Sequence, residues 1–235
     1  MRQPLRTVLI ALPLQAVAVV VDLPKLPKSA LLGGAAQSTS KRGAACEELS
    51  HWLSTHGGDA AAVEVGASRR GGWGLITNRH VRAGEILARV PRTLACCAND
   101  APPYLAATRD RHDLGRLSAR GAVAAKVCEA AVDEAFEDWL EAQPSMADLE
   151  SLPVLWEDAD ELLRGCRNVH LATEAKALWR RELETANRRR RAFDASLDDL
   201  CWPEWAHAQA LVLSRGNAPA GLGYALVPVL DFVNH

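Results

Sequence analysis

The change of pattern along this chain constrains its fold more than any other feature. Residues 44–100 hold short runs typical of strands; in residues 85–90, Ile86, Ala88 and Val90 share one face before Pro91 ends the run. Residues 101–200 instead carry apolar side chains at helical spacing. Residues 201–235 begin as a helix and end in the strand-like run 224–230. The pattern predicts β-structure towards both ends and a helical middle.

Individual elements follow from the same reading. A short amphipathic helix is expected over residues 47–53, and strands are expected around Val63 and Val65 and around Leu75 and Ile76. The helical middle predicts one apolar stripe from Val123 to Leu140, closed by Pro144. Further helices are expected over residues 158–163, 173–193 and from Pro203 onward.

The first 43 residues differ from the rest and are predicted to be a targeting leader. Arg2 and Arg6 precede an apolar run over residues 8–21, which is the layout of a signal peptide. The stretch that follows is basic, hydroxylated and almost free of acidic residues, as in an organellar transit peptide. This order is typical of proteins sent to plastids, so a plastid location is expected, with the cytoplasm as the alternative. A leader that is not cleaved is the other interpretation.

Composition excludes several classes of protein. The chain has 235 residues and a formal net charge of −2, which argues against a nucleic-acid binder driven by bulk positive charge. No apolar run has the length of a membrane-spanning helix. The six cysteines lack the spacing of a zinc site, so no metal is expected. The basic run 188–191 lies among acidic residues and is interpreted as a solvated helix face.

Each motif, taken alone, is weak evidence for a function. Gly72-Trp73-Gly74 lacks the third glycine of a dinucleotide loop and is best interpreted as a turn. Ser214 is not in a nucleophile elbow, so a serine hydrolase has no support. Asp231, Asn234 and His235 would need a fourth ligand elsewhere to form a metal site.

The order of the motifs is more specific. Residues 72–91 read GWGLITNRHVRAGEILARVP and resemble the opening of a SET domain, in the branch of the Rubisco large-subunit lysine methyltransferase and the actin-histidine methyltransferase. A helical insert follows, with FEDWLEAQP at residues 136–144 and LPVLW at residues 152–156. Residues 213–215 read LSR and residues 226–235 read LVPVLDFVNH, as in that branch.

The resemblance implies an α+β fold with small sheets of the β-clip type, split by a long helical insert. Residues 44–100 would form the N-terminal part of the domain, residues 101–200 the insert and residues 201–235 the cofactor segment. The implied activity is methyl transfer from S-adenosylmethionine to a lysine of a protein. By position, the residues expected to border the cofactor are Glu85, Ile86, Leu87, Arg215, Asp231, Asn234 and His235.

The acceptor is left open between two amino acids. The position two residues after the motif arginine tends to be aromatic in lysine-directed relatives and is Asn in the actin-histidine enzyme. Here it is Asn217, an expected substrate-binding residue, but Leu230 stands where that enzyme has Trp. Lysine is therefore the first expectation and histidine the alternative. A catalytically silent SET-like interaction module is the reading from a different class.

The resemblance also predicts what the chain lacks. The family's channel-lining tyrosine and its C-terminal substrate-binding domain would both follow His235, so the catalytic residue is unknown and the chain is expected to be a fragment with low activity. Tyr224 precedes the motif and does not replace that tyrosine. A monomer is expected. Rubisco or aldolase is the expected substrate protein if the leader is a transit signal, and a ribosomal protein or actin if it is not.

Overall fold

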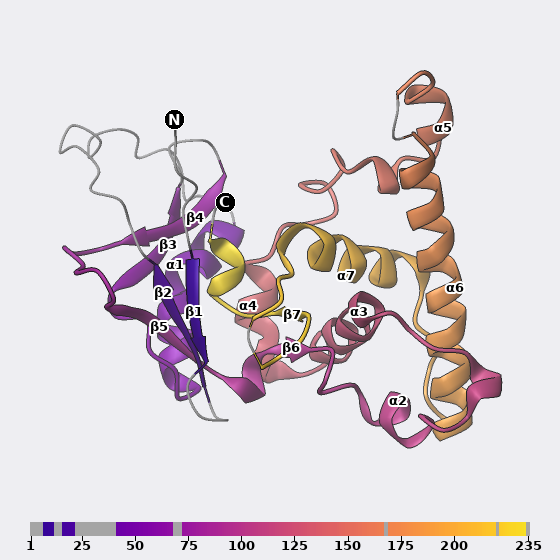
Figure 1. Cartoon of the computed structure of the whole chain (residues 1–235), viewed down its shortest axis with the longest axis horizontal. Helices are drawn as coiled ribbons and strands as arrows, with labels where there is room; N and C mark the ends of the chain where they lie inside the picture. The colour runs from indigo at the N-terminus through magenta and orange to yellow at the C-terminus, as the bar shows by residue number, and fades with distance from the viewer. Residues whose placement is uncertain are drawn as a thin grey trace. The chain divides into compact units, whose positions relative to one another are not determined.

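The computed structural model describes residues 7–11, 16–21, 41–67, 72–166, 169–219 and 221–233 (Figure 1). The chain divides into two compact units. The strand unit comprises Met1–Ala95, Ala135–Gln143 and Asn217–His235, and the helix unit comprises Cys96–Glu134 and Pro144–Gly216. Small antiparallel sheets in one unit and helices in the other confirm the expected α+β class.

Two small sheets form most of the strand unit. Strand β5 (Ile86–Pro91) pairs with β2 (Ala16–Val21), which pairs in turn with β1 (Thr7–Ala11), giving the antiparallel order β1-β2-β5. Strands β3 (Val63–Ala67) and β4 (Trp73–Thr77) form an antiparallel hairpin. Residues 41–43 of the predicted leader begin a helix, and its residues beyond that helix and the strands β1 and β2 lie outside the part of the chain that the structure describes; its targeting role stays a prediction.

The alternation expected in these strands has a physical basis that the structure confirms. In β3, Val63 and Val65 are buried and Glu64 between them is exposed. In β5, Ala88 and Val90 are buried, whereas Arg89 is exposed. β3 therefore has one apolar face towards the core of its unit and one face towards water, whereas β5 also buries Leu87 on its other face.

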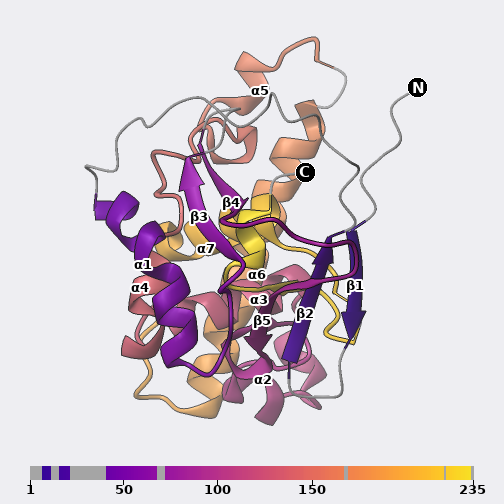
Figure 2. The same ribbon diagram turned by 90° about the vertical axis from the view of Figure 1, so that its left-hand side faces the viewer.

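Helix α1 (Lys41–Thr55) is longer than the helix expected over residues 47–53. It packs against β3 and against α4 (Glu137–Glu141), a short helix that the chain reaches only after its first passage through the helix unit (Figure 2). The strand unit also contains the short strand β7 (Ala225–Leu226) and the 3-10 turn η6 (Leu230–Phe232).

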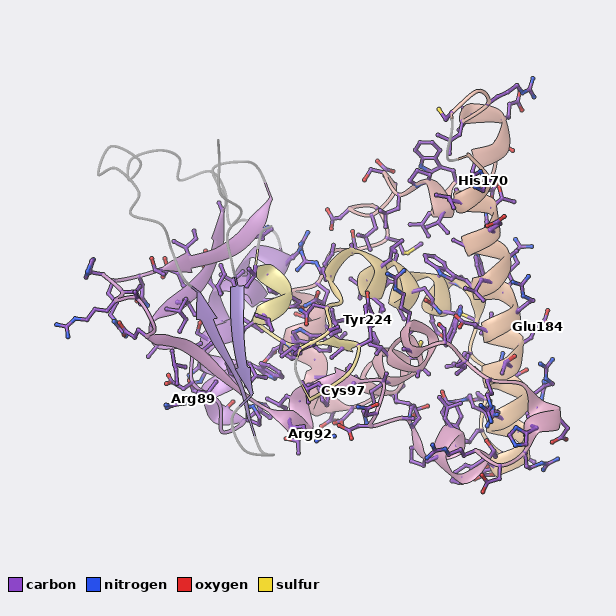
Figure 3. All side chains as sticks on the ribbon, in the orientation of Figure 1. Arg89, Arg92, Cys97, His170, Glu184 and Tyr224 are labelled. Atoms are coloured by element: carbon purple, nitrogen blue, oxygen red, sulfur yellow. The ribbon has the colours of Figure 1, made fainter. Side chains whose placement is uncertain are left out.

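The helix unit contains the elements expected in the middle of the chain. Its longest helix is α6 (Val169–Phe193), along which His170 and Glu184 are exposed (Figure 3). Its other elements in the described residues are β6 (Cys96–Cys97), α2 (Pro103–Ala107), η3 (His112–Leu114), α3 (Ala119–Ala130), η5 (Pro153–Leu155), α5 (Ala159–Leu162) and α7 (Trp202–Arg215). In the strand unit, η2 (Arg92–Leu94) follows β5, and η4 (Glu134–Phe136) precedes α4.

A buried carboxylate links three helices of this unit. Glu182 of α6 accepts hydrogen bonds from the backbone N–H of Ser118, which caps α3, at 2.8 Å and from Nε2 of Gln209 in α7 at 2.9 Å. Only 4% of Glu182 is exposed. Since a buried charge is costly unless hydrogen bonds satisfy it, these bonds fix the three helices together.

Two predicted elements differ from the structure. The single helix expected from Val123 to Leu140 is broken, because α3 ends at Ala130 and Ala131, which the expected apolar stripe would bury, is exposed. The strand expected over residues 224–230 ends at Leu226. Pro228 has no N–H to continue a strand, and Val229 takes a φ of 67°, which a strand residue does not adopt.

The basic run 188–191 is also not simply a solvated face. Arg189 is buried and donates to the carbonyl oxygens of Thr108 and Gly115. Arg190 forms an ion pair with Glu129 and lies over the ring of Tyr104, 5.2 Å from its centroid. These arginines therefore attach α6 to the neighbouring elements of its own unit.

None of the helices in the described part of the chain is long and apolar enough to cross a membrane.

Candidate functional site

Two motifs that are far apart in the sequence meet in the strand unit. Strand β4, which carries the Trp73-Gly74-Leu75 part of the opening motif, packs beside η6, which carries Asp231 (Figure 2). Gly72 precedes β4 with a φ of 74°, a conformation that favours glycine. Gly74 is paired with Gly66 of β3, so neither strand places a side chain at this register. The structure thus brings the first and last sequence motifs together in the strand unit.

The turn that carries Asp231 has a strained backbone. Val229 has φ 67° and ψ −46°, and the N–H of Leu230 donates to the carbonyl oxygen of Pro228 at 2.8 Å. These values define the rare γ-turn with positive φ at its central residue, which is costly for a β-branched side chain. Two further bonds close the turn, from Asp231 N–H to the Val227 carbonyl at 3.0 Å and from Phe232 N–H to the Val229 carbonyl at 3.1 Å.

The carboxylate of Asp231 is buried and receives two donors from α4 and its C-terminal end. Its Oδ2 accepts from Nε1 of Trp139 at 3.1 Å and from Nε2 of Gln143 at 2.7 Å. Asp231 was expected to border the cofactor; the structure shows that this oxygen is engaged by protein side chains. That cofactor role stays a prediction.

Asn217 presents a buried acceptor. Its backbone forms an antiparallel bridge with Ala225, with N–H···O distances of 2.9 and 2.8 Å in the two directions. Its side-chain Oδ1 is buried and accepts no hydrogen bond from the residues that the structure describes. A buried carbonyl oxygen without a donor is costly, so this atom is suited to a donor group on a bound molecule. Arg215, two residues earlier, ends α7 in the helix unit.

The three residues 85–87, which are expected to contact the cofactor, lie in different environments. The carboxylate of Glu85 serves its own turn, accepting from the N–H of Arg82 at 3.0 Å and pairing with the guanidinium of Arg79. The hydrogen bond from Arg79 is the main cause of a lowered Glu85 pKa. Leu87 is buried, and Ile86 is half-buried at the start of β5. These residues lie in the same unit as Asp231 and Asn217.

Three further points concern the other expected site residues and metal binding. Asn234 and His235 lie outside the described residues. Tyr224 is half-buried just before β7, and the catalytic residue stays unknown. Among the described residues, no group of three or more His, Cys, Asp or Glu is arranged to hold a metal ion.

Sequence reasoning missed Trp139 and Gln143 as partners of Asp231. Both belong to the FEDWLEAQP motif, but helical periodicity alone does not show which residue they reach. The only local hint in the sequence is the position of Gln143, a polar residue just before the helix-ending Pro144. In the structure Gln143 is only 4% exposed.

Comparison with known proteins supports the fold. No protein-family model and no curated protein sequence matches the chain. Solved structures do match, among them the SET domain of LSMT bound to lysine and AdoHcy, with 17% identity and a TM-score of 0.62. Rubisco LSMT bound to sinefungin and monomethyllysine matches with 18% identity and a TM-score of 0.62, and Rubisco LSMT bound to AdoMet with 17% and 0.60.

Each of these matches covers 81% of this chain and 44% of the solved chain, so this chain spans less than half the length of those structures. At these identities the likeness shows the fold. The described strands, helices and motif turns are therefore arranged as a SET domain, with the helix unit interrupting the strand unit.

Proposed function

We propose that this chain belongs to an S-adenosylmethionine-dependent protein methyltransferase whose acceptor is a lysine side chain. The meeting of β4 and η6 carries the proposal, because it joins the two ends of the motif series within one SET-like unit. The similar structures contain AdoMet, AdoHcy, lysine or monomethyllysine, which supports the same chemical class here.

The residues present are compatible with this cofactor. A planar guanidinium such as that of Arg215 is suited to a carboxylate, which it can bind through two parallel hydrogen bonds. Two residues later in the sequence, Asn217, the expected substrate-binding residue, has a buried Oδ1 that lacks a donor among the described residues, and an N–H group of the acceptor side chain can supply one. Asn234 and His235 are proposed to contribute to cofactor binding.

When bound, the cofactor supplies a methyl group that is already electrophilic because it is attached to a sulfonium. The chain must therefore hold donor and acceptor in line, an orientation effect that lowers barriers by about 7–11 kcal/mol. A lysine acceptor must first lose a proton, which costs about 4.6 kcal/mol at pH 7. Enclosure by apolar residues lowers the lysine pKa and reduces this cost.

Histidine is the second candidate acceptor, and Asn217 is the observation that favours it. If Asn217 Oδ1 accepts from the Nδ1–H of a neutral imidazole, the lone pair of Nε2 is left to attack the methyl group. Histidine also faces almost no deprotonation cost at neutral pH, since its pKa is near 6.5.

The first experiment is calorimetric titration of the full chain with S-adenosylmethionine. We expect saturable binding, and we expect Arg215→Ala to weaken it about tenfold or more, since a charged pair is lost. Arg191→Ala is the matched control, because Arg191 pairs with Asp199 on the exposed side of α6. Failure of the wild-type chain to bind would contradict the proposal, and equal losses in both variants would contradict the role of Arg215.

The acceptor is tested with the same protein in the presence of S-adenosylhomocysteine. Titration with L-lysine and with N-acetylhistidine, followed by nuclear magnetic resonance, compares the two side chains directly. Stronger binding of lysine supports the first candidate. Stronger binding of the imidazole, lost in Asn217→Ala, supports the second.

The leader gives the proposal a location. We propose that residues 1–43 direct the protein to a plastid, where Rubisco or aldolase would be a substrate; a ribosomal or actin-like protein is the alternative for the cytoplasm. A fusion of residues 1–50 to a fluorescent protein tests this. Fluorescence confined to the cytoplasm would contradict the plastid proposal.

A further inference from the structure

The segment Ala135–Gln143 is built into the strand unit although the residues on both sides of it belong to the helix unit. Helix α1 holds both of its ends. Nε1 of Trp52 donates to the Ala135 carbonyl at 2.9 Å, and Nε of Arg42 donates to the Ala142 carbonyl at 3.1 Å. The backbone of the segment is therefore fixed at two points about two helical turns apart.

Aromatic packing fixes the same segment between those points. The rings of Trp52 and Phe136 have centroids 6.5 Å apart, and those of Phe136 and Trp139 are 5.9 Å apart in an edge-on arrangement. Trp139 is completely buried. Since buried aromatic rings contribute much of the packing energy, these ring contacts hold α4 against α1.

Two side chains of this segment, Trp139 and Gln143, form hydrogen bonds with Asp231. Trp139 and Gln143 both donate to Oδ2, at 3.1 and 2.7 Å, and none of the three residues is more than 6% exposed. Hydrogen bonds to a carboxylate are stronger than neutral ones, and they are stronger still when water is excluded. They act on the residue two positions after the strained Val229.

A strained backbone conformation persists only where its surroundings impose it. The γ-turn at Val229 is followed at once by the η6 turn, and Asp231 is the residue of η6 whose carboxylate is tied to α4. The two donors therefore act against relaxation of the turn towards an extended strand. The same restraint sets the point from which the chain continues to Asn234 and His235.

We infer that Trp139 and Gln143 are positioning residues for the cofactor segment, acting through Oδ2 of Asp231. The effect on cofactor binding rests on the proposed function, whereas the anchoring of the turn by Trp139 and Gln143 does not depend on it. It assigns to this oxygen of Asp231 the task of holding the 228–233 turn, so the carboxylate acts on the cofactor through the position of its neighbours.

Hydrogen exchange of the cofactor-free full chain tests the anchoring. In Gln143→Leu, and in Trp139→Phe, which keeps the ring and removes the donor, amide exchange at residues 230–233 should rise about tenfold. Gln209→Leu is the matched control, because Gln209 is also a buried glutamine that donates to a carboxylate, but in the helix unit. It should leave exchange at residues 230–233 unchanged. Unchanged exchange in Gln143→Leu would overturn the inference, whether or not the chain binds cofactor.

Binding of S-adenosylmethionine by calorimetry tests the consequence. Gln143→Leu should weaken binding about tenfold, whereas Asp231→Asn, whose Oδ1 can accept both donors, should stay within about threefold of wild type. A large loss in Asp231→Asn with none in Gln143→Leu would show that the carboxylate acts on the cofactor directly and would overturn the assignment. Absence of binding by the wild type would instead contradict the proposed function.

Discussion

Asn187 in α6 is bonded to both backbone groups of Leu200. Its Nδ2 donates to the Leu200 carbonyl at 3.0 Å, and its Oδ1 accepts from the Leu200 N–H at 2.9 Å. The side-chain amide thus forms the same pair of hydrogen bonds that a neighbouring backbone strand would form with Leu200. It fixes the loop that leads from α6 into α7.

Removing this amide should destabilise the helix unit. Asn187→Ala leaves two backbone groups without their partner, and we expect the free energy of unfolding to fall by about 1–2 kcal/mol. Urea unfolding followed by circular dichroism measures the change. Asn99→Ala, at an exposed position, is the control and should have little effect. Equal stability of Asn187→Ala and wild type would show that the two bonds contribute nothing.

Gly121 should not tolerate alanine, although alanine normally favours a helix. An added Cβ would lie 2.7 Å from Oε1 of Glu182, whose bonds to Ser118 and Gln209 prevent it from moving away. We expect Gly121→Ala to lower stability by about 1–3 kcal/mol instead of raising it by about 1 kcal/mol. In a Glu182→Ala background the same substitution should cost less. A stabilising Gly121→Ala in the wild-type background would disprove the contact.

Cys128 should be alkylated more slowly than the exposed cysteines. Burial is the main cause that raises its pKa to about 12, so the reactive thiolate is scarce at pH 8. Iodoacetamide labelling followed by peptide mass spectrometry should modify the exposed Cys166 and Cys201 at least about tenfold faster. In urea the three rates should converge. Equal rates in the folded protein would contradict the shift.

The same shift has a consequence for stability. A pKa raised on folding contributes stability that is complete below the unfolded value, near 8.5, and is lost as pH rises towards the folded value of about 12. The melting temperature of wild type should therefore fall more steeply between about pH 8.5 and 10 than that of Cys128→Ala. Parallel curves would contradict this sign.

Glu85 provides a test at acid pH. The hydrogen bond from Arg79, followed by the N–H of Arg82, lowers its pKa, so its contribution to stability is present above the unfolded pKa and disappears as pH falls. Nuclear magnetic resonance titration of the Glu85 carboxyl should give a value below that of a free glutamate, and Arg79→Ala should raise it. Glu64, exposed on β3, is the internal reference and should not respond to Arg79→Ala.

Strands β1 and β2 should stabilise the strand unit by covering one edge of β5. β2 pairs with β5 from Ala16 opposite Pro91 to Val20 opposite Ile86, so deletion of residues 2–21 leaves that edge of β5 without a partner. We expect a lower melting temperature and more aggregation, since unpaired edges recruit other strands. Circular dichroism on heating measures the melting temperature, and light scattering measures the aggregation. An unchanged transition would show that the hairpin does not stabilise β5.

Sequence patterns predicted those parts of the fold in which burial repeats regularly. Val63 to Val65 of β3 and Ala88 to Val90 of β5 alternate between buried and exposed residues, and α6 and α7 follow helical spacing, so these elements were predictable. The break after Ala130 was not predictable, because Ala131 continues the apolar spacing in the sequence and still lies exposed. Burial of Arg189 depends on carbonyl groups 74 and 81 residues away in sequence, which no local pattern reveals.

The candidate site was predictable to a similar degree. The residue types and their order pointed to Asp231 and Asn217 without showing what surrounds them. The partners of Asp231 come from residues 88 and 92 positions earlier, and the positive φ of Val229 has no signal in its side chain. Long-range partners and strained backbone are set by tertiary packing, and periodicity does not record them.

The chain passes between its two units four times, at residues 95–96, 134–135, 143–144 and 216–217. Neither unit is therefore a continuous stretch that one proteolytic cut could release. The strand unit draws on residues from both ends of the described chain, so during synthesis it cannot be completed until residues 217–233 have left the ribosome. Until then the strand unit lacks β7 and η6, and the apolar surface that they cover stays exposed and open to aggregation.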